Sequence, residues 1–459
     1  MDLDRRRFVA LTAAAAVNVA ASPVSAAPSA AAPPSPSSAL GLDAAHFGLR
    51  PGSPDDQSRT LQRALDEAAR ARAPLAIAPG VYRVGSLKLS SGAQLIGVRG
   101  ATRLVFTEGP SLISAAGADH VTLSGLVLDG AGRRLPERRG LVQIENGRGL
   151  KIADCDIVGA GGNGIHCVSV AGDISGTTLA GTADVAIHSF DARGLVIARN
   201  TVSGAGNNGI QVWRGQNGDD GTLVVDNRIE AIDNRAGGSG QYGNAINVFR
   251  AANVIVRGNR INACAFSAVR GNAASNIHIE GNSITDMREV ALYSEFGFEG
   301  ALIAGNTIDG AAIGVAVTNF NEGGRLAVIQ GNLIRNLFPQ RPLGTDPGDG
   351  AGIGIAAEAD TAITGNVVEN APTAGIMLGF GHYLRDVAAT GNVVRKADIG
   401  IAVSVAAGAG TCLIANNLIA DVSRGAIVGL DRRKIVTGDL TKGGAERYAH
   451  LTIGGNRVR

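Results

Sequence analysis

The stretch "VIVRGNRINACAFSAVRG", residues 254–271, combines two short apolar patterns at a fixed separation. Val256 stands three residues before Asn259, and Ile261 stands two residues after it. The small residue Ala268 follows the asparagine by nine positions and comes directly before Val269. Apolar runs this short, alternating and separated by Gly and Asn, are typical of β-strands and not of helices.

The asparagine pattern recurs through the chain, with its apolar neighbours in the same frame. Its copies are centred on Asn200, Asn227, Asn259, Asn282, Asn306, Asn332, Asn366, Asn392, Asn416 and Asn456. Two earlier copies carry Cys155 and Thr177 in the asparagine position. The second pattern, a small residue followed by an aliphatic one, follows the first at a nearly constant separation in the sequence. Spacings that cluster in the twenties predict a solenoid of stacked coils.

Stacked coils of this length predict a single all-β solenoid, a parallel β-helix. Each strand would pair in parallel with its copies in the neighbouring coils, about 4.8 Å away. Asparagine tolerates the left-handed backbone that a sharp corner needs. Its amide can also bond to the same amide one coil away. The repeated asparagines are therefore interpreted as a structural ladder at one corner of the coil, and not as catalytic groups.

The pattern resembles the right-handed parallel β-helix of the pectate-lyase-like superfamily. The segment "AAHFGLRPGSPDDQSRTLQRALDEAARARAPLAIAPGVYRV", residues 44–84, resembles the opening of its polysaccharide-active and phage tailspike members. Asp55, Asp56 and the Ala, Leu, Arg and Glu content of residues 59–72 favour a capping helix at about 55–72. Such a helix would close the apolar end of the solenoid, which is expected to span residues 42–459.

The first residues have the composition of an export signal. Arg5, Arg6 and Arg7 precede Phe8 and an Ala-rich run, and small residues end the segment near Ala26. Residues 1–26 resemble a twin-arginine signal, with an ordinary secretory signal as the alternative. Residues 27–41 are interpreted as an Ala/Pro/Ser linker. Joined to the repeats, the signal is similar to the family of twin-arginine-translocated repeat proteins. This resemblance implies a periplasmic or secreted location, and it points to no particular activity.

Composition excludes several classes of function. The 65 glycines indicate many tight turns, and 42 Lys+Arg against 40 Asp+Glu leave no overall charge to recruit nucleic acid or an anionic membrane. No phosphate loop or basic stripe is present, and the apolar run is too short to span a bilayer. The four cysteines match no zinc spacing. They are interpreted as buried thiols, with a bridge between Cys155 and Cys167 as the alternative.

Two columns of outward positions suggest a functional surface. The residue after the central aliphatic of each second strand is polar in seven coils and then becomes small or apolar: Gln143, His166, His188, Gln211, Asn247, Arg270 and Tyr293, then Ala316, Gly354, Met377, Ala402 and Val428. Two residues further on, the column reads Glu145, Val168, Phe190, Trp213, Phe249, Asn272, Glu295 and Thr318. The polar part would extend over about 30 Å at the usual strand spacing.

The columns predict a groove for an extended polysaccharide, more specifically an acidic one. Aromatic faces can stack on sugar rings, and amide, imidazole and guanidinium groups can bond hydroxyls or carboxylates. The substrate-binding candidates are Gln143, His166, Phe190, Gln211, Trp213, Asn247 and Phe249. Insertions at residues 233–243 and 339–350 should overhang the groove. The alternative is that the aromatic residues form a structural stack under the 233–243 loop and that the polar column is merely solvated.

Catalysis, if the protein is an enzyme, would be that of a polysaccharide lyase or epimerase. Such enzymes remove a proton next to a carboxylate and stabilise the resulting charge. Arg270 could neutralise that charge, and Glu295 could add a carboxylate. Tyr293 could transfer protons together with His188 or His166. A glycosidase needs paired carboxylates about 5 to 9 Å apart, whereas Glu145 and Glu295 would lie about six coils apart. The other class is a non-catalytic envelope protein that serves as a binding module or scaffold.

No cofactor is evident in the sequence. Lyases of the superfamily use Ca²⁺, but no clear acidic cluster supports a calcium site. His166 and His188 should face outward on adjacent coils, and imidazoles bind copper or zinc. No third ligand accompanies them, so no metal site is assigned.

Overall fold

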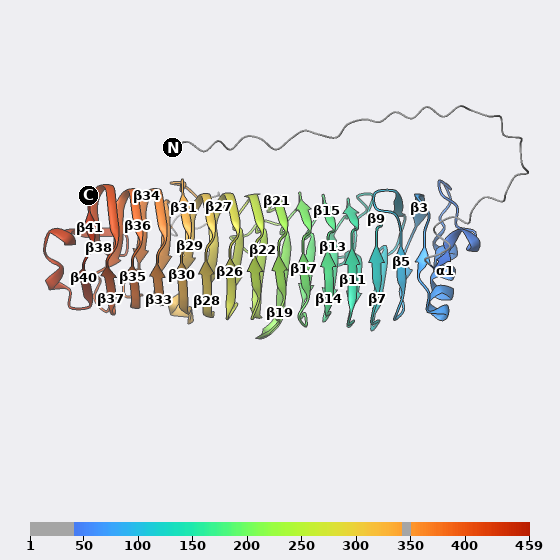
Figure 1. The fold of residues 1–459 in the computed structure, drawn as a ribbon, viewed down its shortest axis with the longest axis horizontal. Helices are drawn as coiled ribbons and strands as arrows, with labels where there is room; N and C mark the ends of the chain where they lie inside the picture. Colours follow the sequence, from blue (N-terminus) through green and yellow to red (C-terminus); the bar gives the residue numbers. More distant parts are fainter. Residues whose placement is uncertain (1–40, 342–349) are drawn as a thin grey trace, which may run out of the picture. The chain divides into compact units, whose positions relative to one another are not determined.

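The computed structural model describes residues 41–341 and 350–459. The expected export signal and residues 27–40 of the expected linker lie outside this part of the chain, as does most of the 339–350 insertion. Parallel strands stack coil on coil along the described chain, and this confirms the single all-β solenoid (Figure 1). Among the described residues, no helix is both long and apolar enough to cross a membrane.

The strands form a 16-stranded sheet A and a 25-stranded sheet B. Sheet B bends and consists of two rows of strands, and a coil contributes one strand to each row. Sheet A contains β1 (Leu42–Asp43), β2 (Leu75–Ala76), β5 (Gln94–Ile96), β8 (Thr122–Ser124), β11 (Leu150–Ala153), β14 (Gly172–Ser175), β17 (Val196–Ala198), β20 (Leu223–Val225), β23 (Ile255–Arg257), β26 (Ile277–Glu280), β28 (Glu299–Ala304), β30 (Arg325–Gln330), β33 (Ala359–Thr364), β35 (Arg385–Thr390), β37 (Cys412–Ala415) and β40 (Leu451–Gly454).

Row 1 of sheet B follows the asparagine corner, and row 2 follows row 1. Row 1 contains β3 (Gly80–Val84), β6 (Thr102–Phe106), β9 (Val127–Asp129), β12 (Asp156–Val158), β15 (Thr178–Ala180), β18 (Thr201–Ser203), β21 (Arg228–Ile232), β24 (Arg260–Cys264), β31 (Leu333–Arg335) and β41 (Arg457–Val458). Row 2 contains β4 (Leu87–Lys88), β7 (Ile113–Ala116), β10 (Gly140–Glu145), β13 (Asn163–Val168), β16 (Ile187–Phe190), β19 (Ile210–Asp219), β22 (Ile246–Ala252), β25 (Val269–Asn272) and β32 (Ile353–Ala357).

In the C-terminal coils the two rows are joined into long bent strands. These are β27 (Ser283–Glu295), β29 (Thr307–Val317), β34 (Val367–Leu378), β36 (Val393–Ser404) and β38 (Leu418–Asp431). The hairpin strand β39 (Lys434–Asp439) pairs antiparallel with β38. Within residues 41–341 and 350–459, short 3-10 helices occupy four connections: η2 (Ala44–Phe47), η3 (Phe320–Glu322), η5 (Leu440–Lys442) and η6 (Ala445–Arg447).

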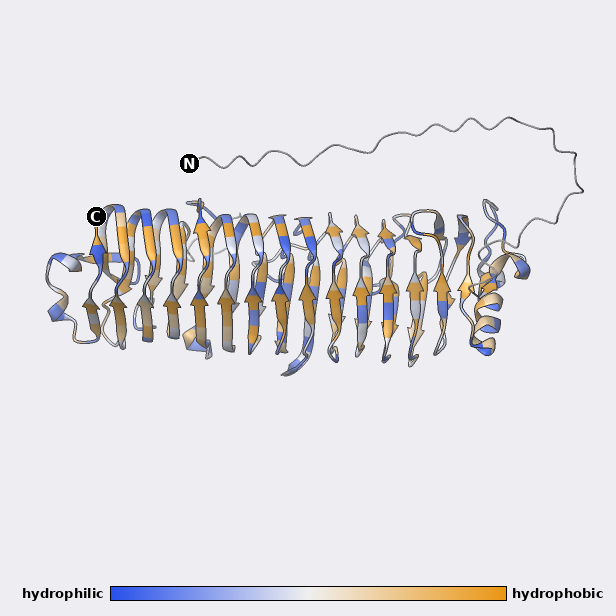
Figure 2. Cartoon of the chain, in the orientation of Figure 1, coloured by the Kyte–Doolittle hydropathy of each residue, from blue (hydrophilic) through white to orange (hydrophobic). Residues whose placement is uncertain are grey.

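Alternation along each strand supplies the core. In β10, for example, Val142 and Ile144 point inward and are at most 1% exposed. Equivalent aliphatic residues of successive coils pair in register, so the core continues from coil to coil, as the apolar strand segments show (Figure 2). Parallel strands that repeat the same inward positions therefore bury one long hydrophobic core.

The expected capping helix is present as α1 (Ser58–Ala71). Leu61, Ala64, Leu65 and Ala68 lie on one helical face and are buried in the same cluster as the inward residues of the first coils. The helix ends where Arg72 adopts a left-handed backbone with φ 52°. It thereby covers the apolar N-terminal end of the solenoid.

The asparagine ladder is confirmed, with two corrections. Asn306 Oδ1 accepts from the Asn282 backbone N–H at 2.9 Å, and Asn306 Nδ2 donates to the Ile279 carbonyl at 2.9 Å and to Asn332 Oδ1 at 3.0 Å. The expected left-handed backbone is found one residue before each ladder position, for example at Gly305 with φ 63°.

The ninth ladder residue is Asn417, and not Asn416 as expected. Asn417 bonds to both Asn392 and Asn456, whereas Asn416 occupies the left-handed position with φ 56°. Two consecutive asparagines made the position ambiguous in the sequence. Thr177 extends the ladder in the expected place, because its backbone N–H donates to Asn200 Oδ1 at 3.0 Å.

All four cysteines are free and buried. Burial raises the pKa of the Cys155 thiol to about 11 and that of Cys167, Cys264 and Cys412 to about 12. These thiols stay protonated at neutral pH and serve as small apolar groups in the core.

Candidate functional site: the outer face of row 2

The polar column is Gln143, His166, His188, Gln211, Asn247, Arg270 and Tyr293, and the structure places these residues in register on consecutive strands of row 2. The column continues through Ala316, Ala356, Met377, Ala402 and Val428. Ala356 replaces the expected Gly354, because Gly352-Ile353 and Gly354-Ile355 both match the pattern and the register aligns the second pair. The change from polar to small or apolar side chains is confirmed.

The column was expected to face solvent, and this is wrong for six of its seven polar members. Gln143, His166, His188, Gln211, Asn247 and Arg270 are at most 9% exposed. Their side chains project from the outer face of the sheet, but other segments of the chain cover them. A Cβ on Gly240 would lie 1.6 Å from Arg270 Nη1, so the 233–243 loop packs directly on this guanidinium. The backbone of Arg138 bonds to His166 at the other end.

The aromatic row, Phe190, Trp213 and Phe249, is half-buried and packs edge to face. Trp213 lies 5.8 Å from Phe249 and 5.4 Å from His188 between ring centroids, at interplanar angles of 65° and 77°. Its indole N–H donates to Asn247 Oδ1 at 2.6 Å, and the Arg250 guanidinium covers Phe249 at 4.7 Å. Rings in this geometry pack against the polar column and offer no flat aromatic face on which a sugar ring could stack.

A buried charge cluster, Arg270, Glu289, Glu295 and Arg341, lies at the C-terminal end of the column. Arg270 donates to both oxygens of Glu295 at 2.6 and 2.9 Å and to Glu289 at 3.3 Å. Arg341 reaches Glu289 at 2.7 Å. Both insertions therefore contribute to one site, because Gly240 and Arg341 meet the same cluster from separate loops, as the sequence predicted.

Three of the four catalytic candidates come together. The Arg270 guanidinium lies 5.1 Å from the centre of the Tyr293 ring and is bonded to Glu295. His188 lies three strands away along the column, since Gln211 and Asn247 intervene. Among the described residues, no group of three potential metal ligands from His, Cys, Asp and Glu is found.

His188 provides a prediction for acid stability. Burial lowers its pKa from 6.5 to about 3, assisted by His166, which stacks on it at 4.6 Å. In the unfolded chain His188 takes up a proton below about pH 6.5, whereas the folded protein resists this until about pH 3. Stability should therefore fall with decreasing pH in this window, by about 1.4 kcal/mol per pH unit.

We expect His188→Gln to remove that contribution. Between pH 7 and pH 4.5 the variant should lose about 2 to 3 kcal/mol less unfolding free energy than the wild type. Urea unfolding at both pH values measures the difference. Parallel losses in the two proteins would show that His188 does not remain neutral in the folded state.

A cavity of about 490 Å³ opens where the polar column ends. Its floor is the outer face of row 2 from β27 to β38, made by Val290, Ile313, Ala316, Ile353, Ala356, Ala374, Met377, Ile399 and Ala402. Alanine occupies column positions that hold long polar side chains in earlier coils, so the cavity is the space those side chains would fill. This volume is in the range of small-molecule and cofactor sites.

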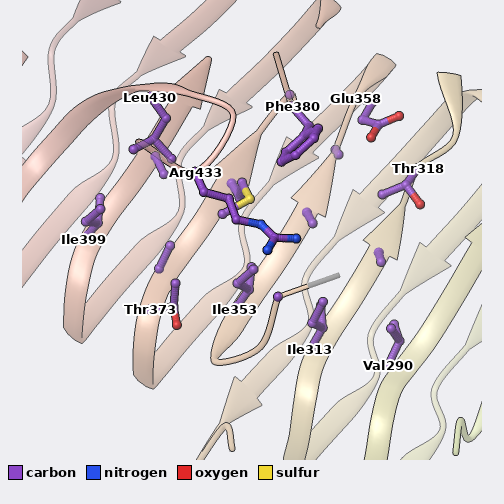
Figure 3. Close-up of a pocket in the computed structure, with 18 of the residues that line it drawn as sticks. Val290, Ile313, Thr318, Ile353, Glu358, Thr373, Phe380, Ile399, Leu430 and Arg433 are labelled. Atoms are coloured by element: carbon purple, nitrogen blue, oxygen red, sulfur yellow. The ribbon is translucent and has the colours of Figure 1, made fainter. Parts of the chain in front are cut away.

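Polar groups surround the floor (Figure 3). Arg433 extends from the β38–β39 turn across the cavity, and Phe380, Glu358 and Thr318 line the opposite side. Arg433 makes no ion pair within the described part of the chain, whereas Arg424 is paired with Asp398 at 2.8 Å.

Burial raises the pKa of two acids in the cavity. The Tyr293 phenol is shifted above its ordinary value by burial and by the Glu295 carboxylate, so it stays protonated at neutral pH and can donate a hydrogen bond. Burial likewise raises the pKa of Glu358, although the Phe320 backbone N–H donates to its carboxylate at 2.8 Å. The cavity therefore combines one unpaired cation with two groups that retain protons more readily than usual.

Comparison with known proteins identifies the family. A family model described as the right handed beta helix region matches residues 111–240 and 216–385, together more than half of the chain. The chain belongs to the right-handed β-helix family. No curated protein matches it in sequence.

Solved right-handed β-helix structures resemble the described fold. An alginate lyase in complex with a trisaccharide has 13% sequence identity and a TM-score of 0.56, over 91% of this chain and 95% of that one. The N-terminal fragment of gene product 12 of bacteriophage Phi29 has 15% identity and a TM-score of 0.55, over 92% of this chain and 71% of that one. At such identities the resemblance shows the fold alone.

The sequence did not single out several residues of this β-helix site. Glu289, Arg341, Glu358 and Arg433 lie outside the two outward columns: Glu289 is at the register shift inside β27, Arg341 and Glu358 are in connections, and Arg433 is in the β38–β39 turn. A signal did exist for the floor: the run of small and apolar residues after Tyr293 in the column. It was interpreted as the end of the surface, and the structure shows the base of a cavity there.

Proposed function

We propose that the protein binds an acidic polysaccharide on the outer face of row 2, with the cavity as the principal site, and that it does so outside the cytoplasm. The observation that carries the proposal is the convergence of Arg433, Tyr293 and Glu358 around one cavity. Arg433 supplies a positive charge for a sugar carboxylate, and the protonated Tyr293 supplies a donor for a hydroxyl or carboxylate.

Local charge favours an acidic ligand over a neutral one. The Arg341 and Arg424 guanidinium groups are each paired with a carboxylate, and Glu358 has a raised pKa. Arg433 is therefore the cation that the cavity leaves for a ligand. The similar fold of an alginate lyase solved with a trisaccharide supports a carbohydrate as the ligand, and the twin-arginine pattern of residues 5–8 supports export.

Replacing Arg433 with glutamine should weaken binding of an acidic polysaccharide roughly tenfold, because one charge-assisted contact is lost. Titration calorimetry with alginate and polygalacturonate measures the affinity, and dextran serves as the neutral control. Arg432→Gln is the matched variant, since Arg432 is an exposed neighbour in the same turn that does not line the cavity. Wild-type protein that binds no acidic polysaccharide, or that binds dextran equally well, would refute the proposal.

A lyase or epimerase reaction is the second candidate, and the shared cavity of Tyr293 and Glu358 favours it. Arg270 is engaged by two carboxylates, so it would act through Tyr293 and would not contact the substrate. Absorbance of unsaturated products, followed with and without Ca²⁺, tests elimination, and NMR of the polymer tests epimerisation. Binding without either reaction would favour the non-catalytic class of envelope binding protein.

A further inference from the structure

We infer that the cavity recognises an acidic saccharide that carries a short acyl substituent, such as an acetyl ester. This inference rests on the proposed function and specifies its substrate. It is carried by the combination of an aliphatic floor with an unpaired cation at the rim.

The floor is apolar without belonging to the main core. Val290, Ile313, Ala316, Ile353 and Ala356 form one separate cluster on the outer face of sheet B. Ala374, Ile399, Ala402, Val428 and Leu430 form a second one. Met377 packs against both, so the two clusters make one continuous aliphatic surface. The members of both clusters are at most 9% exposed. An apolar ligand group that enters the cavity would therefore leave water for an aliphatic lining, and this transfer is favourable.

The chemistry of this floor differs from that of a surface for unmodified sugar rings. Sugar rings stack on aromatic faces, but the floor is made of alanine, isoleucine, valine and methionine, with Phe380 only at the side. Branched aliphatic side chains complement a methyl or methylene group instead. A carboxylate bonded to Arg433 and hydroxyls bonded to Tyr293 or Thr318 would hold the sugar at the rim, while its acyl group faces the floor.

The size of the effect follows from burial. Each methyl or methylene group removed from water contributes about 0.8 kcal/mol, equivalent to about fourfold in affinity. An acetylated acidic polysaccharide should therefore bind at least about fourfold more tightly than the same polymer without its acetyl groups.

A matched pair of ligands tests the inference on the full chain. Acetylated alginate and the same sample after mild alkaline de-acetylation are titrated into wild-type protein by calorimetry. The variant Ala356→Leu places a larger side chain on the floor, so it should abolish the preference for the acetylated sample. Ala402→Leu is the second variant should the first fail to fold. Ala362→Leu, on the exposed outer face of sheet A, is the matched control and should keep the preference.

The outcomes separate the two proposals. Equal affinity for both samples would overturn this inference and leave the proposed function standing, whereas no binding of either sample would overturn the proposed function itself. Tight binding of octanoate alone, without discrimination between the two samples, would also overturn the inference and assign the cavity to a free fatty acid chain.

Discussion

Replacing Asn306 with alanine should lower the free energy of unfolding by about 3 to 6 kcal/mol. The side chain satisfies the Asn282 N–H and the Ile279 carbonyl in a buried corner, and it joins the amides above and below. Each buried polar group left without a partner costs about 1 to 3 kcal/mol. Urea unfolding of wild type and variant measures the loss.

Two further variants calibrate this result. Asn306→Thr should cost less than Asn306→Ala, because Thr177 already holds a ladder position and its Oγ1 accepts from the Cys155 N–H at 3.4 Å. Asn217→Ala, at an exposed position near the end of β19, should change stability by less than about 0.5 kcal/mol. A loss below about 1 kcal/mol for Asn306→Ala would mean that water satisfies the corner and that the ladder is not a major source of stability.

The second large effect is expected for Arg270→Met. Removal of the Arg270 guanidinium leaves Glu295 without its counter-charge and Glu289 with only one of its two arginine partners. Both glutamates are 2% exposed. Breaking one side of a buried ion pair typically costs about 3 to 5 kcal/mol. We therefore expect a loss of this size in urea unfolding at pH 7.

The double variant Arg270→Met with Glu295→Gln should recover part of that loss, because it removes one of the stranded charges. Arg250→Met is the control, since Arg250 is a half-exposed arginine one strand away that covers Phe249. It should cost less than about 1 kcal/mol. Equal effects of Arg270→Met and Arg250→Met would show that the charge cluster does not hold the end of the polar column in place.

In the proposed lyase or epimerase reaction, Arg270 and Glu295 would therefore act as positioning residues. Arg270 and Glu295 neutralise each other, and the 233–243 loop covers Arg270. They hold Tyr293 at the border between the polar column and the cavity. The roles of Gln143, His166, His188, Gln211 and Asn247 in substrate binding remain predictions, and a ligand would have to displace their covering loops to reach them.

Local pattern determined the repeat architecture. Period-two alternation fixes which residues of a strand face inward, and an asparagine at the same place in each coil fixes the stacking register. The parallel β-helix, its capping helix and the alignment of the polar and aromatic columns followed from residues 44–84 and from the repeats alone. The errors at Asn416 and Gly354 arose where two asparagines were adjacent and where two Gly-Ile pairs followed each other.

Tertiary structure decided what covers those positions. A repeat places a side chain on the outer face of a coil, but whether that side chain is exposed depends on loops that the repeat does not encode, such as those contributing Arg138, Gly240 and Arg341. The same reasoning applies to the cavity. Alanine in the column marks missing volume, and only the placement of Phe380 and of the β38–β39 hairpin around that space turns it into a cavity. The sequence by itself thus determined the scaffold and its outward columns, because these depend on neighbouring residues and identical coils. The location of the site depended on contacts between segments far apart in the chain.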